Sequence, residues 1–214
     1  MNLSRSVEIL CLVILPVISY FIGNISPATL VGRLYGVDIR KEGSGNPGTT
    51  NVLRTLGKKA AAATLLVDVL KGFLPTFAAG LAVSDLAAIL CATAALLGHM
   101  WPVCFRFQGG KGVATGFGAA LAIDWKVGLL ALLFAVLGVL LTKRMSCGSI
   151  FAAVSFPVFT YIFVSAAPGA MGWEYIWAVC MAVLIIWRHR KNIVRLIHRE
   201  EPPLSFLSGK NRDA

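Results

Sequence analysis

The sequence predicts an all-α, polytopic membrane protein, and its composition and length carry this prediction. Of the 214 residues, 57% are hydrophobic and only 14% are charged, whereas about a quarter of a soluble globular chain is charged. The mean hydropathy is +0.76. Because a transmembrane helix takes about 20 apolar residues, a chain of this length holds roughly six or seven spans and little else. We therefore treat residues 1–214 as a single transmembrane domain.

Seven apolar segments follow one another along the chain. The first begins after Arg5 and is too long for the apolar part of a secretory signal peptide, so it is interpreted as a retained span. The fourth, 113–123, is short for a full crossing, and a half-helix or re-entrant segment is the alternative. The predicted spans are 9–32, 60–82, 86–105, 113–123, 127–142, 147–165 and 173–187.

The tendency of cationic loops to stay in the cytoplasm decides the direction of insertion. If there are seven crossings and the N-terminus is external, the outer loops contain only two cations, Arg5 and Lys126. If segment 113–123 did not cross, the basic C-terminal stretch would lie outside. We therefore expect seven crossings, a cytoplasmic C-terminus and a short fourth span that local bilayer thinning accommodates. The predicted cytoplasmic loops are 33–59, 106–115 and 188–200, followed by a polar tail at 201–214.

The charge and the cysteines narrow the class of protein further. The net charge of +10 is explained by basic cytoplasmic loops that lie beside anionic lipid. Membrane lipid is therefore the expected partner. We expect neither nucleic acid nor an obligate protein partner. The five cysteines lie in or beside apolar stretches and form no Cys-x-x-Cys pair. Since there is also no acidic cluster for magnesium, we expect no metal and no cofactor.

The first predicted cytoplasmic loop is dense in groups that bind anions. Glycines allow a ligand to approach the backbone closely, and successive amides in such a turn form a concave anion site. Arg54 can bind a phosphate in bidentate fashion, and a helix starting near Thr50 would direct its positive end at the same anion. An ordinary turn is the alternative. The candidate residues are Gly43, Ser44, Gly45, Asn46, Gly48, Thr50, Asn51 and Arg54.

The second predicted loop is a glycine-rich turn that opens directly into the short fourth span. A short helix whose N-terminus points at a bound anion is a recurring arrangement in membrane proteins, and Lys111 would add a positive charge. A flexible cytoplasmic loop with one lysine is the alternative. The candidate residues are Gly109, Gly110, Lys111 and Gly112.

The third feature is the basic stretch that continues the last span. Binding to anionic lipid explains some of its charges. It does not explain His189 and Asn192, which lie three residues apart on one helix face. We therefore keep these two residues as site candidates.

Three ionisable residues lie within predicted spans. Asp68 and Lys71 are three residues apart in the second span, where they are either a functional pair or a structural ion pair. His99 lies near the cytoplasmic end of the third span, as a hydrogen-bonded interior histidine or as part of the site. All three are possible site residues.

Glycine-rich loops with Lys and Arg at one membrane face favour small phosphorylated ligands. Metal-dependent phosphoryl transfer is disfavoured, because the magnesium and zinc ligands are missing. There is no paired Asp/Glu arrangement for general acid–base chemistry. An activated phosphorylated substrate that needs only positioning and charge stabilisation fits these residues.

In these three segments the sequence resembles the bacterial acyl-phosphate:glycerol-3-phosphate acyltransferases. The resemblance runs over about residues 23–200 and includes the segments 68–72 and 99–102. It implies a seven-span enzyme of the cell inner membrane, with its active site on the cytoplasmic side. Such a transferase moves a fatty acyl group from acyl phosphate to the 1-hydroxyl of sn-glycerol 3-phosphate. The products are lysophosphatidate and inorganic phosphate, in phospholipid biosynthesis.

The resemblance also assigns roles to the candidate residues. The first loop would hold acyl phosphate, and Gly109–Gly112 would hold glycerol 3-phosphate. The proton acceptor stays open between His189 and a phosphate oxygen of the substrate. Ser44 is a binding residue or, alternatively, a covalent nucleophile. The candidate catalytic residues are His189, Asn192, Ser44 and Arg54.

Three positions depart from the family pattern, and none of them is a core site residue. Thr49 replaces a common alanine or serine, Gln108 a common lysine, and Lys191 a common acid. No histidine has an aspartate five positions later, so the chain does not resemble the acyltransferases that use acyl-CoA. The alternatives are a transporter of a phosphorylated solute, a lipid or nucleotide sensor, and a lipid-phosphate phosphatase.

Overall fold

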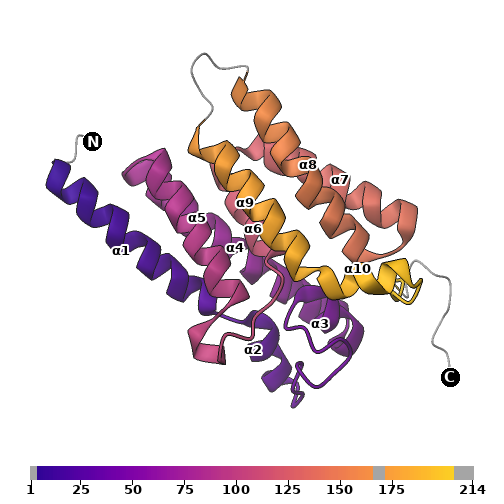
Figure 1. Cartoon of the computed structure of the whole chain (residues 1–214). Helices are drawn as coiled ribbons and strands as arrows, with labels where there is room; N and C mark the ends of the chain where they lie inside the picture. The colour runs from indigo at the N-terminus through magenta and orange to yellow at the C-terminus, as the bar shows by residue number, and fades with distance from the viewer. Residues whose placement is uncertain (1–3, 166–171, 205–214) are drawn as a thin grey trace. The chain divides into compact units, whose positions relative to one another are not determined.

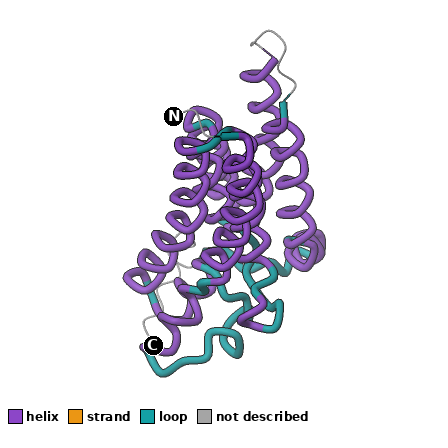
Figure 2. Tube along the Cα trace, turned by 90° about the vertical axis from the view of Figure 1, so that its left-hand side faces the viewer, coloured by secondary structure: helices purple, strands orange, loops and turns teal. Residues whose placement is uncertain are grey.

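The computed structural model describes residues 4–165 and 172–204, and this part of the chain contains helices and loops but no strand (Figures 1 and 2). The prediction of an all-α chain is therefore confirmed for the described residues. The chain divides into two compact units, Met1–Trp125 and Lys126–Ala214. The sequence motifs are divided between them, so each unit is described separately.

The first unit is built on α1, α4, α5 and α6. Helix α5 packs against α1 and α4, and α4 packs against α6. Shorter helices lie in the connections, before and after the first glycine-rich loop. In order, the elements are α1 (Arg5–Asn24), α2 (Pro27–Leu34), α3 (Thr49–Leu56), α4 (Lys58–Ala82), α5 (Asp85–Met100), η1 (Val103–Phe105) and α6 (Val113–Ile123).

The second unit contains the last three predicted spans and the basic stretch after them. Helix α8 packs against α9, and α10 continues from α9 after a single residue, His189. The edge-to-face contact of Phe156 with Trp177 is part of the packing between α8 and α9. The elements are α7 (Trp125–Thr142), α8 (Met145–Ser165), α9 (Trp173–Arg188) and α10 (Arg190–Ile197).

Two predicted spans are each interrupted near one end. The first, 9–32, is a pair of helices, because Pro27 disfavours helical geometry at the residue before it and has no N–H to donate. The third, 86–105, is helical as far as Met100 and continues after Pro102 as the short turn η1. The second interruption directly precedes the second glycine-rich loop.

The helix surfaces are those of a membrane protein. On α1, the side chains of Ile9, Val13 and Phe21 are more than half exposed, which water disfavours and lipid tails permit. By length and composition, five helical stretches among the described residues could cross a bilayer. These are Arg5–Leu34, Lys58–Ala82, Asp85–Phe105, Trp125–Thr142 and Met145–Phe163, while Val113–Ile123 is a shorter apolar helix.

Glycine allows α4 and α6 to approach closely. A Cβ atom at Gly72 would overlap the carbonyl of Thr115, and one at Gly118 would overlap the carbonyl of Val69. Small residues at helix contacts are typical of membrane proteins, where packing replaces the hydrophobic effect as the main source of helix association. This contact fixes the start of α6, and with it the end of the second glycine-rich loop.

Candidate functional site

The first glycine-rich loop is organised by Asn51, whose side chain is buried at 1% exposure. Its Oδ1 accepts a hydrogen bond from the Ser44 backbone N–H at 2.8 Å. Its Nδ2 donates to the carbonyls of Ile39, at 3.0 Å, and Glu42, at 2.9 Å. Since these three bonds commit the amide group to the loop backbone, the side chain of Asn51 shapes the loop.

Helix α3 begins at the end of this loop. Gly48 is its N-cap and Thr49 its first residue, so the helix starts one residue earlier than predicted and no threonine caps it. Gly43 and Gly45 have φ angles of +56° and +69°, a region that favours glycine. The Thr49 hydroxyl is buried and has no hydrogen-bond partner among the described residues. The loop therefore ends at a helix N-terminus with a buried polar atom still to satisfy.

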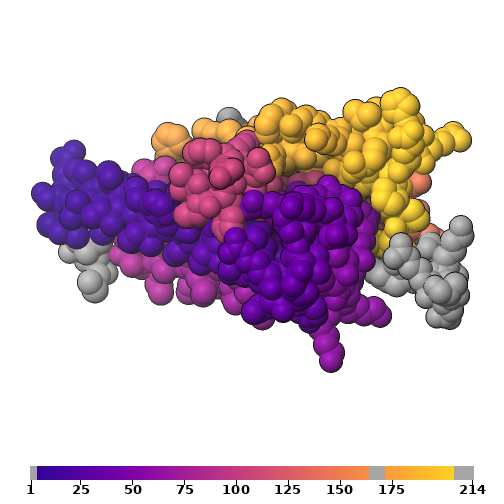
Figure 3. Space-filling model, turned by 90° about the horizontal axis from the view of Figure 1, so that it is seen from below, coloured from indigo at the N-terminus to yellow at the C-terminus, as the bar shows by residue number. Residues whose placement is uncertain are grey.

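Arg40 is a further cation of this loop that was not among the residues predicted for the site. Its guanidinium lies 4.9 Å from the ring centroid of Phe105, in η1. Its Nε and Nη2 are buried, and neither has a hydrogen-bond partner among the described residues. In Figure 3, the segment around η1 lies beside the N-terminal segments of the first unit, which are drawn in indigo and purple. Two buried guanidinium donors of this kind are suited to an anion or to water.

The second glycine-rich loop rests on the last turn of α5. The Gly110 N–H donates to the carbonyl of His99 at 3.1 Å. A Cβ atom at Gly109 would overlap that carbonyl, and one at Gly110 would overlap the His99 ring. Gly112, with a φ of +82°, is the N-cap of α6. The N-terminus of α6 therefore follows a loop that only glycine can bring this close to α5.

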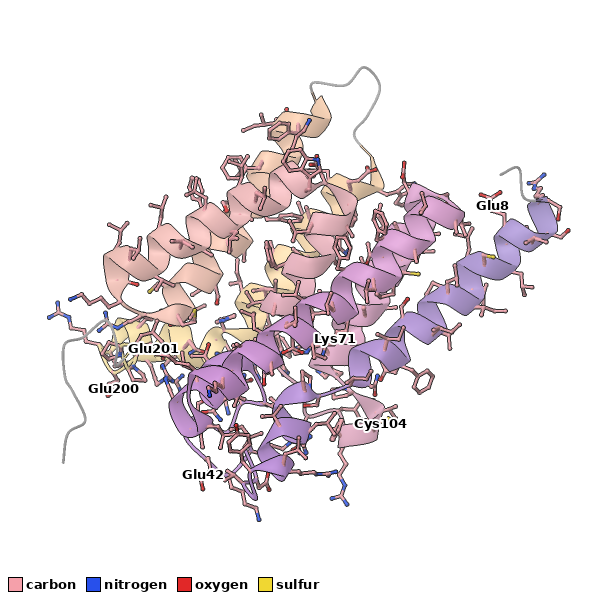
Figure 4. The ribbon with its side chains drawn as sticks, turned by 180° about the vertical axis from the view of Figure 1, so that it is seen from behind. Glu8, Glu42, Lys71, Cys104, Glu200 and Glu201 are labelled. Atoms are coloured by element: carbon pink, nitrogen blue, oxygen red, sulfur yellow. The ribbon has the colours of Figure 1, made fainter. Side chains whose placement is uncertain are left out.

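The three ionisable residues of the predicted spans come together beneath this loop. Asp68 Oδ1 lies 2.7 Å from Lys71 Nζ and 3.4 Å from His99 Nδ1. Lys71, labelled in Figure 4, also donates to the carbonyl of Ile25 at 2.6 Å. All three side chains are buried. Asp68 and Lys71 therefore form a buried ion pair, which was one of the two alternatives predicted from the sequence, and His99 lies beside it.

In the second unit, His189 and Asn192 lie where α9 passes into α10. His189 is 2% exposed, and its Nδ1 lies 2.8 Å from the carbonyl of Ile185. When Nδ1 donates to that carbonyl, Nε2 is the acceptor nitrogen of the neutral ring. Asn192 donates through Nδ2 to Glu201 Oε1 at 2.7 Å. Both side chains are thus held in fixed orientations.

Glu201, which the sequence analysis assigned to the polar tail, is buried and holds this region together. Arg195 Nε donates to its Oε2 at 2.7 Å, and Arg144 Nε donates to its backbone carbonyl at 2.9 Å. Burial raises the pKa of the Glu201 carboxyl, but the hydrogen bonds from Arg195 and Asn192 and the charge of Arg195 outweigh burial. The pKa of Glu201 is therefore below its ordinary value, and the carboxylate is ionised.

The remaining candidates are more accessible. Ser44 is exposed, Arg54 and Lys111 are partly buried, and each lies in the loop or helix where the sequence predicts it. The first unit thus holds both glycine-rich loops, and the second holds His189 with Asn192. Across the described residues, no group of three or more His, Cys, Asp or Glu side chains is arranged to hold a metal ion.

Comparison with known proteins places these features in one family. The profile of the family described as "Glycerol-3-phosphate acyltransferase" matches residues 13–199. A glycerol-3-phosphate acyltransferase of Clostridioides difficile (strain 630) is 43% identical over 201 residues, which are 91% of this chain and 96% of that protein. One from Thioalkalivibrio sulfidiphilus (strain HL-EbGR7) is 45% identical over 190 residues, covering 87% and 90% of the two chains.

The backbone is also similar to that of two solved structures. Both are crystal structures of PlsY (YgiH), an integral membrane glycerol 3-phosphate acyltransferase. The glycerol 3-phosphate form has a TM-score of 0.84 at 36% identity and covers 92% of this chain and 97% of its own. The lysophosphatidic acid form has a TM-score of 0.81 at the same identity, with coverage of 90% and 95%.

Proposed function

Because the chain belongs to the glycerol-3-phosphate acyltransferase family, it is an acyltransferase of phospholipid synthesis that acylates glycerol 3-phosphate, and we propose that acyl phosphate is its acyl donor. The observation that carries this proposal is the presence of two glycine-rich loops, each with its own cation, Arg54 or Lys111. Acyl phosphate and glycerol 3-phosphate each present one small phosphate group. Two anion-binding loops match two such substrates.

We assign the first loop to acyl phosphate. The left-handed turns at Gly43 and Gly45 bend the loop toward the start of α3, which adds the positive end of a helix. The buried Thr49 hydroxyl and the buried donors of Arg40 supply polar atoms that a phosphate would satisfy. Ser44 and Arg54 complete this set, and Asn51 keeps the loop in shape.

We assign the second loop to glycerol 3-phosphate. The residues Gly109–Gly112 lead into the N-terminus of α6, where the helix dipole favours an anion. Lys111 adds a point charge at that end of the helix. The absence of side chains at Gly109 and Gly110 lets this loop pack closely on the end of α5.

The proposed reaction needs no metal and no cofactor. The 1-hydroxyl oxygen of glycerol 3-phosphate attacks the acyl carbonyl carbon and forms the new ester bond. The bond from that carbon to the phosphate oxygen breaks, and inorganic phosphate leaves with the bonding electrons. The hydroxyl proton passes to His189 or to a phosphate oxygen. Cations and backbone amides lower the barrier by holding the two phosphates in place.

We also propose the finer topology of the chain. The five long apolar stretches, together with α6 and the 16-residue α9, would give seven crossings. With the N-terminus outside, the loops 33–59, 106–115 and 188–200 lie on the cytoplasmic face of the inner membrane, in agreement with their positive charge.

A comparison of donors tests the proposed function. The purified full-length protein in lipid receives labelled glycerol 3-phosphate and either palmitoyl phosphate or palmitoyl-CoA, without added metal. We expect lysophosphatidate from palmitoyl phosphate alone, with an equal amount of inorganic phosphate released. Lysophosphatidate from palmitoyl-CoA alone would contradict the donor assignment. Phosphate release without acylated glycerol 3-phosphate would instead indicate a phosphatase.

A further inference from the structure

A chain of polar contacts crosses the buried interior of the first unit. It begins at the carbonyl of Ile25, at the break between α1 and α2, where Lys71 Nζ donates at 2.6 Å. It continues through Asp68 Oδ1, 2.7 Å from Lys71, to His99 Nδ1 at 3.4 Å. Exposure of Asp68, Lys71 and His99 is 2%, 4% and 8%. These polar contacts therefore connect the end of α1 with α4 and α5 below the protein surface.

This chain of contacts ends at the second glycine-rich loop. His99 contacts the loop in two ways, because its carbonyl accepts from the Gly110 N–H and its ring lies against the Gly110 Cα. The ring atom that a Cβ at Gly110 would meet first is Nε2. The other ring nitrogen, Nδ1, faces Asp68. One side of the imidazole thus faces a fixed carboxylate and the other side supports the loop.

Stability alone does not account for these residues. A buried ion pair is often no more stabilising than apolar side chains of similar volume, because both charges lose their hydration. A buried, fully connected polar network instead fixes one arrangement of its members. In this protein, the network fixes the orientation of the His99 ring against Gly110.

We propose that Asp68, Lys71 and His99 are positioning residues for the loop Gly109–Gly112 and thereby set the affinity for glycerol 3-phosphate. The proposal rests on the assignment of that substrate to this loop. Asp68 orients the ring, Lys71 anchors Asp68 to the break between α1 and α2, and the ring holds the loop amides in register with the start of α6. None of the three side chains needs to contact the substrate.

Steady-state kinetics with both substrates tests the positioning role. The variant His99→Asn in full-length protein should raise the KM for glycerol 3-phosphate by roughly threefold to tenfold, because the ring that supports the loop is lost while the groups assigned to the substrate remain. The KM for acyl phosphate should stay within about twofold. The control is His198→Asn, since His198 is an exposed histidine whose Nδ1 bonds the carbonyl of Val194 and not a carboxylate. An equal rise in both KM values, or a fall in kcat alone, would overturn the proposal.

A double-mutant cycle tests the contact itself. Gly110→Ala places a methyl group against the His99 ring, so its effect on the KM for glycerol 3-phosphate should be smaller in a His99→Ala background. Independent, additive effects would show that the ring does not support the loop. If His99 variants fold poorly, the double variant Asp68→Asn with Lys71→Met removes both charges together and should give the same selective change in KM.

Hydrogen–deuterium exchange provides a readout that needs no turnover. Amides of the segment 106–112 should exchange faster in His99→Asn than in the unchanged protein, and should not change in His198→Asn. Unchanged exchange in His99→Asn would overturn the proposal. If the unchanged protein failed to acylate glycerol 3-phosphate, the proposed function alone would be contradicted, and the exchange comparison would still decide whether the loop is positioned by His99.

Discussion

At the scale of single residues, several polar side chains hold backbone and other side chains in place. Asn51 uses its amide to shape the first loop, and Glu201 fixes Asn192 and Arg195 in the second unit. Such residues fix the shape of their surroundings, because a buried polar group must be satisfied and its partners are thereby held in place. Arg40 is different, because its buried donors have no partner among the described residues.

The buried carboxylate of Glu201 should make the stability of the fold depend on pH. Because its folded-state pKa is lowered from 4.5, the carboxylate stabilises the fold above that pH and stops doing so as the pH falls through the lower folded-state value. The variant Glu201→Gln should be less stable at pH 7 by about 1–3 kcal/mol, the range for hydrogen bonds to a charged group. Its stability should also depend less on pH below about 4.5.

Thermal unfolding in detergent across this pH range measures both effects. Glu200→Gln is the control, since Glu200 is exposed and Glu201 is buried. Equal stability of the two variants at pH 7 would contradict the role given to Glu201.

Sequence patterns identified candidate residues but could not predict most of the residues that they contact. The Asp68–Lys71 pair was predictable because the residues lie one helical turn apart. His99 is 31 positions further along the chain than Asp68, and their contact depends on how α5 packs against α4. Glu201 lies beyond the last predicted cytoplasmic loop, so nothing in its local sequence distinguishes it from an ordinary tail residue.

At the scale of elements, prolines and glycines set the helix ends that lie near the loops. The short fourth segment was predicted at 113–123, and α6 has those bounds. The break before Pro27 was missed, because hydropathy stays high through residues 9–32 and masks a local backbone constraint. That break matters, since it exposes the carbonyl of Ile25 that Lys71 binds.

Two aspartate–lysine pairs on this chain have the same spacing but differ in burial. Asp68 and Lys71 are 2.7 Å apart and buried, whereas Asp38 and Lys41 are 4.0 Å apart and exposed. Asp68→Asn leaves a buried lysine uncompensated and should destabilise the protein by about 3–5 kcal/mol. Asp38→Asn should cost less than about 1 kcal/mol.

With the other four cysteines replaced by serine, the buried thiol of Cys91 provides the measurement, because it reacts with a thiol reagent only when the first unit opens. The melting temperature from this reaction should fall for Asp68→Asn and remain close to that of the unchanged protein for Asp38→Asn. Equal shifts for the two variants would show that the buried pair has no special role in the fold.

At the scale of the whole molecule, the chain is a multi-pass membrane enzyme, and most of its candidate site residues lie in loops and helix ends. Composition and hydropathy predicted its class, since few soluble proteins combine 57% hydrophobic residues with 14% charged residues. The order of the motifs predicted the family. What sequence patterns could not predict is the packing of each loop on its helices, which depends on contacts between distant segments such as Gly110 and His99.

We propose that the two glycine-rich loops hold two different phosphate-bearing substrates. Steady-state kinetics of Arg54→Gln and Lys111→Gln, with acyl phosphate and glycerol 3-phosphate each varied, tests this division. Each variant removes one cation, worth about 1.5–3 kcal/mol when it bonds a phosphate, so one KM should rise roughly tenfold to a hundredfold.

We predict that Arg54→Gln raises the KM for acyl phosphate and that Lys111→Gln raises the KM for glycerol 3-phosphate. His189→Gln, measured in the same series, should lower kcat while leaving both KM values near those of the unchanged protein. If Arg54→Gln and Lys111→Gln raised the KM for the same substrate, or if neither changed any KM, the division of the two substrates between the two loops would be wrong.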